Sequence, residues 1–282
     1  MVAGNGKIYG IPYSAASVLV VDPVTRTADR ASIPVATFSA KWLGGVMARN
    51  GRIYAIPPVA AAVLIIDPTT NATDTTSLAG LTGFRNWAGG GGVLADNGKI
   101  YGLPSHAASV LIIDPATNTV DTASMPAPAG EFKYYGGVTG RDGKIYGIPL
   151  DAAAVLIIDP AINATDATTM AITTGPSANK WIGGVLGADG RIYGLPSHAG
   201  SVLVIDPAAN RTSVTDITGL GGSAMWFGGA TNKLKISYVS HTRPPRCSLS
   251  TRSAPPPATC SKKKMEERRT DRRKLIENNN NI

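Results

Sequence analysis

The 282-residue chain has few aromatic residues, little charge and almost no cysteine. Aromatic residues make up 6% and charged residues 16% of it, and its two cysteines, Cys247 and Cys260, lie near the C-terminus. The low charge argues against a helical bundle or coiled coil, and the body has no cysteine for a disulfide, a nucleophile or a metal cluster. No apolar run approaches the roughly 18 to 20 residues of a membrane span, and no signal peptide is visible. We therefore expect a soluble protein with no membrane partner, cytoplasmic by default.

The positive charge of the chain is confined to its last fifty residues. Residues 1–232 carry 14 Lys and Arg against 15 Asp and Glu, whereas residues 233–282 carry 13 against 4. The second segment is also rich in proline and asparagine, a composition that cannot bury a core. We interpret residues 233–282 as a disordered or non-native basic tail, with a nuclear-localisation or nucleic-acid patch as the alternative. Nucleic acid is not expected to bind elsewhere.

A repeat of about 46 residues organises residues 1–232. A Gly-Lys/Arg-Ile-Tyr phrase and an Asp-Pro pair return at nearly constant spacing, and periods of this length are typical of propellers. The phrase begins at Gly6, Gly51, Gly98, Gly143 and Gly190, at spacings of 45, 47, 45 and 47 residues. The Asp-Pro pairs begin at Asp22, Asp67, Asp114, Asp159 and Asp206.

Each repeat divides into four short strands separated by turn residues. The first strand, a, opens on a double glycine, and the second, b, holds the Ile-Tyr pair. The third, c, is the aliphatic run before Asp-Pro, expected to be buried on both faces. The fourth, d, is rich in threonine and suits an outer edge. The pattern predicts an all-β fold, a β-propeller with five detectable four-stranded blades over residues 1–232.

The double glycine, the Ile-Tyr pair and the aliphatic run into Asp-Pro-x-Thr-Asn resemble kelch-type β-propeller repeats. The double glycines begin at Gly44, Gly91, Gly136, Gly183 and Gly228. The resemblance implies a scaffold that presents its loops to a protein partner or a repeated ligand.

The ends of the repeat region leave two ways to complete the ring. The segment from Trp226 to Ala230 is a further strand a, which could complete the first blade and close a five-bladed ring. The repeat lengths alternate, however, as if the ancestral unit were a pair of blades. The alternative is that a sixth blade has been lost or replaced by the tail.

The strongest candidate binding residues are basic and aromatic residues just before strand a. In a propeller this strand lies innermost, so their side chains would encircle one mouth of the central channel and could stack on sugars or donate hydrogen bonds. Packing of tryptophan between blades under a lysine stem is the structural alternative. The candidates are Lys41, Trp42, Arg85, Trp87, Lys133, Tyr134, Lys180, Trp181 and Trp226.

Histidine and acidic residues give weaker candidates. His106 and His198 occupy equivalent loops between strands b and c, in the pairs Ser105-His106 and Ser197-His198, and are included as possible ligand-binding residues. Most acids repeat with the blades and suit turn hydrogen bonding. Only Glu131, Asp151 and Asp216 break that pattern.

We therefore expect a non-enzymatic binding module for a protein or saccharide ligand, monomeric, with no cofactor, metal or catalytic residues. The first alternative is a multivalent lectin-like propeller that uses the Lys/Trp ring. The second is a carbohydrate-active hydrolase or lyase that uses Asp151 or Glu131.

Overall fold

The computed structural model describes residues 1–83, 85–87, 90–173, 178–215 and 220, together with the backbone of two later strands. All regular structure in this part of the chain is β, which confirms the all-β class. Met1–Thr242 forms one compact unit. The part of the basic tail that follows Thr242 lies outside the described residues, and it contains both cysteines. Asp216 also lies outside them. None of the described elements is a helix long and apolar enough to cross a membrane.

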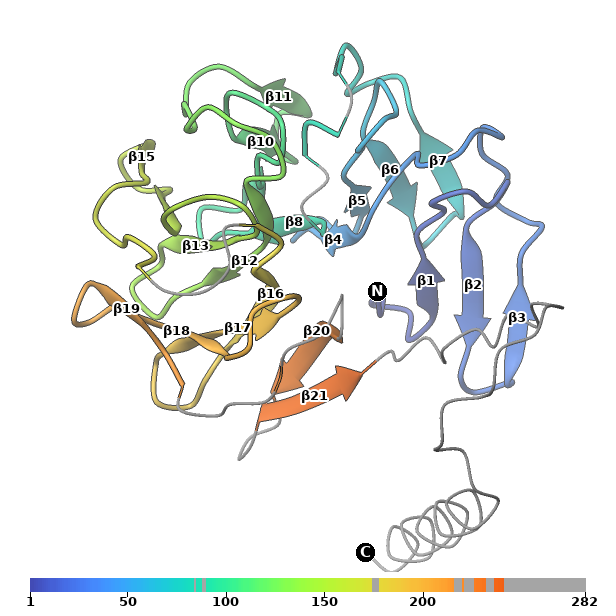
Figure 1. The fold of residues 1–282 in the computed structure, drawn as a ribbon. Coiled ribbons are helices and arrows are strands. Elements are labelled where there is room, and N and C mark those ends of the chain that lie inside the picture. The colour runs from blue at the N-terminus through green and yellow to red at the C-terminus, as the bar shows by residue number, and fades with distance from the viewer. Residues whose placement is uncertain are drawn as a thin grey trace, which may run out of the picture. The chain divides into compact units, whose positions relative to one another are not determined.

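Five antiparallel sheets follow one another along the chain as the blades of a propeller, which confirms the predicted fold (Figure 1). Four of them have four strands, and the first has three strands plus an isolated bridge between Val2 and Ile8. The strands are β1 (Ile8–Gly10), β2 (Leu19–Asp22) and β3 (Thr27–Asp29); β4 (Gly45–Met47), β5 (Ile53–Ala55), β6 (Leu64–Asp67) and β7 (Ala72–Asp74); β8 (Gly92–Leu94), β9 (Ile100–Gly102), β10 (Leu111–Asp114) and β11 (Thr119–Asp121); β12 (Tyr134–Thr139), β13 (Ile145–Pro149), β14 (Leu156–Asp159) and β15 (Ala164–Asp166); and β16 (Trp181–Leu186), β17 (Ile192–Pro196), β18 (Leu203–Asp206) and β19 (Arg211–Val214).

A further hairpin follows the fifth blade and reproduces its first two strands. Strand β20 (Trp226–Thr231) pairs with β21 (Ile236–Ser240) in the register, bulge included, in which β16 pairs with β17. The prediction that this C-terminal strand a completes the first blade is therefore wrong, because the segment that follows it supplies its partner as a local hairpin. Strand β21 also lies beyond residue 232, where the sequence analysis ends the propeller.

Neighbouring blades pack through one repeated apolar contact. The strand-b tyrosine of one blade and an aliphatic residue of its strand c lie against the strand-b isoleucine and strand-c leucine of the next. In the first such contact, Tyr9 and Val20 share a cluster with Ile53 and Leu64. The same arrangement recurs in the next three clusters along the chain. The buried strand c that the sequence predicts therefore joins blade to blade.

The double glycines allow the inner strands to approach closely. The first strands of neighbouring blades contact one another in succession, from β4 to β8, β12 and β16. Gly136 has a positive φ of 85°, and a Cβ there would lie 2.9 Å from the Cα of Gly183 in the next blade. A side chain at this position is excluded both by backbone conformation and by space.

We expect Gly136→Ala to lower the free energy of unfolding by at least about 2 kcal/mol, because the left-handed backbone and the close contact act together. Gly4→Ala is the control, since a Cβ at Gly4 meets nothing within 4 Å. Thermal and denaturant unfolding of both variants would measure the difference. Equal stability of the two variants would contradict this account of the inner strands.

In each of the first three blades, an asparagine in the turn between strands a and b forms a hydrogen bond to the next blade. The Asn97 amide donates to the Tyr101 hydroxyl at 2.9 Å and to the carbonyl of Pro160, in the following blade, at 3.4 Å. Asn5 and Asn50 make the same two contacts. In the fourth blade Asp142 takes this position; its carboxylate accepts from Tyr146 at 2.7 Å but has no N–H to donate to the next blade.

Exchange of these residues should change stability in opposite directions. Asn97→Asp removes one inter-blade hydrogen bond, whereas Asp142→Asn supplies a donor facing Pro207, so we expect shifts of about 1 kcal/mol down and up, respectively. Melting temperatures of the two variants, measured beside the wild type, provide the test. Shifts of both melting temperatures in the same direction would show that this inter-blade hydrogen bond does not determine the change in stability.

Candidate functional site

A hollow of about 410 Å³ is lined by residues of all five blades, and we call the end of the propeller where it lies the mouth. Its lining comes from the segments before strand a and from the loops after strand b, and is largely apolar. The lining residues are Tyr13, Ala40, Leu43, Pro58, Val59, Arg85, Ser105, Phe132, Tyr135, Leu150 and Ile182. Burial raises the pKa of the Tyr135 hydroxyl, consistent with a weakly hydrated wall. A hollow of this size and composition suits a small organic ligand.

Backbone hydrogen bonds hold the rim of this hollow together from blade to blade. The peptide N–H of Lys133 donates to the carbonyl of Ser105 in the preceding blade at 3.1 Å, and its own carbonyl accepts from Leu150 at 2.9 Å. Lys180 repeats this pattern with Leu150 and Ser197. The loops of the mouth are therefore fixed by main-chain contacts that do not depend on which side chains they present.

In each of the four segments that precede the inner strands of the second to fifth blades, one residue has a left-handed backbone. Ala40, Arg85, Phe132 and Asn179 have φ values of 58°, 56°, 47° and 53°. Non-glycine residues rarely adopt this conformation, and such strain concentrates at functional sites. Three of the four side chains line the hollow. Of these four residues, only Arg85 is among the candidates predicted from the sequence. The sequence signal for the other three is that this position changes residue type in every blade.

His106 lies beside this hollow, between an acid and two further polar or charged groups. Its Nδ1 lies 3.3 Å from the Ser105 hydroxyl and its Nε2 lies 3.8 Å from the Glu131 carboxylate. The edge of its ring meets Phe132 at a centroid distance of 4.4 Å, and the Arg85 guanidinium lies 5.6 Å from the centre of the same ring. The His106 side chain is 15% exposed, which leaves it within reach of a ligand.

The arrangement brings together a proton-transferring group, an acid that can pair with it when it is protonated, and a cation. Such a set can remove a proton from a bound molecule and stabilise the negative charge that develops. His198, the equivalent residue of the fifth blade, keeps the contact with its neighbouring serine at 3.2 Å. It is exposed, and within the described residues it forms no ion pair with an acid.

The structure places the lysines of the expected ring inside the protein. Lys41, Lys133 and Lys180 are 0%, 2% and 3% exposed. The ammonium group of Lys133 donates to the carbonyls of Ala107 and Gly130, both at 2.9 Å, and Lys41 makes the corresponding pair of bonds. Burial lowers the pKa of all three lysines. The ammonium groups of Lys41 and Lys133 therefore hold backbone carbonyls of neighbouring loops.

The tryptophans are buried as well. The indole N–H groups of Trp42, Trp87 and Trp181 donate to backbone carbonyls of Ala62, Ser109 and Ser201 at 2.8, 3.0 and 2.8 Å. Their rings therefore offer no open face on which a sugar could stack. The side chain of Trp226 lies outside the described residues.

The alternative catalytic acids, Glu131 and Asp151, make different contacts at this rim. Glu131 is 76% exposed and lies beside His106. Asp151 accepts a hydrogen bond from the backbone N–H of Asn179, which fixes the rim of the next blade. Among the residues that the structure describes, no group of three or more His, Cys, Asp or Glu is placed to hold a metal ion.

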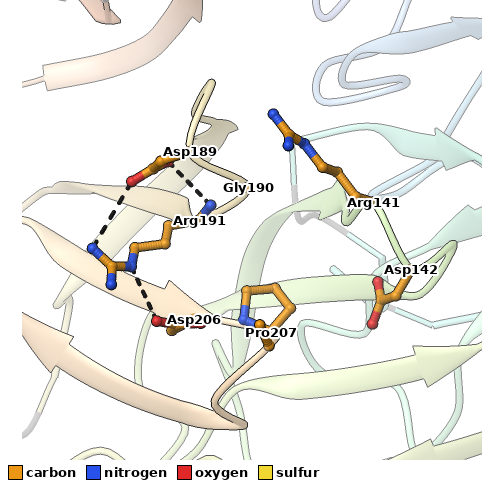
Figure 2. A pocket seen from close by; sticks show the side chains of 8 residues that line it. Arg141, Asp142, Asp189, Gly190, Arg191, Asp206 and Pro207 are labelled. Carbon is orange, nitrogen blue, oxygen red and sulfur yellow. Dashed lines mark hydrogen bonds and ion pairs between the residues drawn. The ribbon is translucent and has the colours of Figure 1, made fainter.

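A second hollow, of about 550 Å³, lies between the fourth and fifth blades at the opposite end of the strands (Figure 2). Its charged groups largely engage one another. The Arg191 Nε lies 3.0 Å from the Asp206 carboxylate, and the Tyr193 hydroxyl donates to Asp189 at 2.7 Å. Arg141 donates to the backbone carbonyl of Ala188. These groups hold blades together, so we place the candidate site at the mouth.

Solved structures with the same fold include enzymes and extracellular domains. A catalytically inactive histidine-to-alanine variant of virginiamycin B lyase from Staphylococcus aureus, with quinupristin, matches with a TM-score of 0.70 and 12% identity over 85% of this chain and 75% of that one. A streptogramin B lyase matches at 0.62 and 14%, over 76% and 66%. The extracellular domain of a protein classed as a one component system from B. thetaiotaomicron matches at 0.58 and 11%, over 85% and 33%.

The chain thus spans 66% to 75% of the length of these two lyases. No family model matches it, and no curated protein matches it significantly. At these identities the likeness shows a β-propeller and no more, and the kelch-type relationship stays a prediction.

The comparison overturns the expectation that the protein is not an enzyme. That expectation depended on the lack of a singular catalytic pair in the sequence, whereas solved structures that share this fold include lyases. A propeller scaffold is therefore no argument against catalysis, because activity depends on the residues that the loops supply.

Tyr134 differs from the tryptophans at the same position in neighbouring blades, because its buried hydroxyl has no hydrogen-bond partner among the residues that the structure describes. We expect Tyr134→Phe to raise the free energy of unfolding by about 1 kcal/mol, since it removes an unsatisfied buried group. Trp42→Phe, which leaves the carbonyl of Ala62 without its donor, should lower it by a similar amount. Chemical denaturation of both variants measures this contrast; destabilisation by Tyr134→Phe would contradict it.

Proposed function

We propose that the protein is a propeller enzyme of the lyase type, which binds a bulky, largely apolar organic molecule at the channel mouth. His106 removes a proton from it. The observation that carries the proposal is the position of His106 beside the hollow, between Ser105 and Glu131 and against the Phe132 ring that Arg85 also faces. Presentation of loops to a ligand, which the sequence predicts, is retained in this proposal, and the ligand is chemically transformed there.

The chemistry assigned to these residues is an elimination. His106 takes a proton from the carbon next to a carbonyl group, a carbon–carbon double bond forms, and the bond to the leaving oxygen breaks with its electron pair. The Arg85 guanidinium stabilises the negative charge that develops on the carbonyl oxygen, and Glu131 pairs with the protonated imidazole.

Two further observations support an apolar ligand and a catalytic histidine. The lining of the hollow is mostly aliphatic and aromatic, which suits an organic ring system better than a hydroxyl-rich saccharide. The lyase from Staphylococcus aureus is catalytically inactive when one of its histidines is alanine. A role for histidine on the same fold is compatible with His106 as the base.

The test is turnover of quinupristin, and of a panel of aromatic esters with an acidic proton next to the carbonyl, followed by mass spectrometry. We expect His106→Ala to lower kcat/KM about 10²- to 10⁴-fold, the usual contribution of a general base, with ligand affinity retained. His198→Ala, at the equivalent position of the fifth blade, is the matched control and should keep nearly full activity.

The product distinguishes elimination from hydrolysis. Elimination adds no water to the total mass and creates a double bond that absorbs in the ultraviolet, whereas hydrolysis adds one water for each bond cleaved. Binding to the mouth without turnover of any compound, or equal losses in His106→Ala and His198→Ala, would overturn the proposal.

A further inference from the structure

Tyr135 brings a hydroxyl group into the hollow at a position where the other described blades have no polar side chain. It stands just before the double glycine of the inner strand, where the second and fifth blades have Leu43 and Ile182 and the third has Gly90. The side chains of Leu43, Tyr135 and Ile182 all line the hollow. Among the described residues at this position, Tyr135 is therefore the one whose side chain can donate a hydrogen bond to a bound molecule.

The Tyr135 ring lies against the third blade, which also carries His106. A Cβ at Gly90 would lie 3.0 Å from the Cε1 atom of this ring, so the glycine leaves room for it. Phe132, three residues before Tyr135, meets the His106 ring at a centroid distance of 4.4 Å. The contact between the third and fourth blades therefore positions both the imidazole and the Tyr135 hydroxyl.

The Tyr135 hydroxyl forms no hydrogen bond with another residue that the structure describes. The strand-b tyrosines differ in this respect, since the Tyr101 hydroxyl accepts from Asn97 at 2.9 Å and the Tyr146 hydroxyl donates to Asp142 at 2.7 Å. Burial raises the pKa of Tyr135, so its hydroxyl keeps its proton at neutral pH. A protonated hydroxyl in a hollow, left without a partner by the described residues, can donate to a ligand.

The lining contains two other hydroxyls, and neither combines these properties. The Ser105 hydroxyl lies 3.3 Å from Nδ1 of His106 and so can orient the imidazole. Tyr13 belongs to the first blade, two blades away from His106, and is 47% exposed. Tyr135 is the lining hydroxyl that is enclosed, lies beside the blade of His106 and is free to meet a ligand.

We propose, on the basis of the lyase function proposed above, that Tyr135 is the catalytic acid that protonates the leaving oxygen. His106 removes the proton next to the carbonyl group, the carbon–carbon double bond forms, and the carbon–oxygen bond breaks with its electron pair on oxygen. The Tyr135 hydroxyl gives its proton to this oxygen. The phenolate then regains a proton from the imidazolium through water, so both residues end as they began.

A catalytic acid at this position determines which group can leave. An alkoxide is strongly basic and leaves slowly unless it is protonated as the bond breaks, whereas a carboxylate is weakly basic and leaves without help. The expected substrates are therefore β-alkoxy carbonyl compounds with an apolar body that fits the rest of the lining. The products are an unsaturated carbonyl compound and an alcohol.

Steady-state kinetics of Tyr135→Phe on a matched pair of substrates tests this role. Both compounds have the same aromatic ester skeleton, and the β-carbon carries either a methoxy or an acetoxy group. We expect kcat/KM to fall about 10²-fold or more for the methoxy compound and less than about threefold for the acetoxy compound, because only methoxide needs an acid to leave. Loss of a merely structural contact would lower both values by the same factor.

Tyr134→Phe is the matched control, since it removes the same group from the adjacent residue. The Tyr134 ring is fully buried in the apolar core between the third and fourth blades. This variant should keep the wild-type kcat/KM for both compounds. The melting temperature of Tyr135→Phe should equal that of the wild type, because the substitution removes no hydrogen bond between described residues.

The outcomes separate this role from the proposed function. If the wild type converts both compounds and Tyr135→Phe changes kcat/KM equally for the two, the role of Tyr135 is overturned and the lyase function stands. The same holds if the wild type eliminates acetate but not methanol, or if Tyr134→Phe reproduces the loss seen in Tyr135→Phe. A wild type that converts neither compound, nor any member of the ester panel, overturns both.

Discussion

The apolar contact between neighbouring blades is the interaction on which the rest of this structure depends. A short four-stranded sheet cannot bury both of its faces alone, and here each blade covers the isoleucine and leucine of the next with a tyrosine and an aliphatic residue. The double glycines permit this packing near the axis because no side chain separates the inner strands. In the first blade the equivalent residues Ile8 and Leu19 stay 38% and 41% exposed, because no neighbouring blade is described against them.

The mouth of the channel follows from this packing and is then fixed by its own backbone bonds. Main-chain hydrogen bonds join each rim segment to the loop of the blade before it. The buried ammonium group of Lys133 also donates to backbone carbonyls of these loops. A rigid rim lets the side chains at its left-handed positions vary freely. Alanine, arginine, phenylalanine and asparagine stand there in successive blades, so the repeat that makes the scaffold uniform leaves the site asymmetric.

This asymmetry explains why one histidine of an equivalent pair is the stronger candidate. His106 and His198 share a loop position and a neighbouring serine, but among the described residues only His106 has an acid and an aromatic ring placed beside it by the next blade. The difference comes from the segment before β12, which carries Glu131 and Phe132. Chemistry at this mouth therefore depends on residues of adjacent blades and on no single repeat.

The sequence by itself determined the repeat, the all-β class and the five blades, because each strand and turn is a local signal that returns five times. It also identified the residues before strand a, but not the direction of their side chains: lysine and tryptophan are polar enough to face a ligand, and only packing placed them in the core. The tertiary structure likewise decided that β20 pairs with β21, and that His106, Glu131 and Arg85 meet at Phe132. Such contacts join different loops, and their geometry depends on how blades stack, which no local pattern encodes.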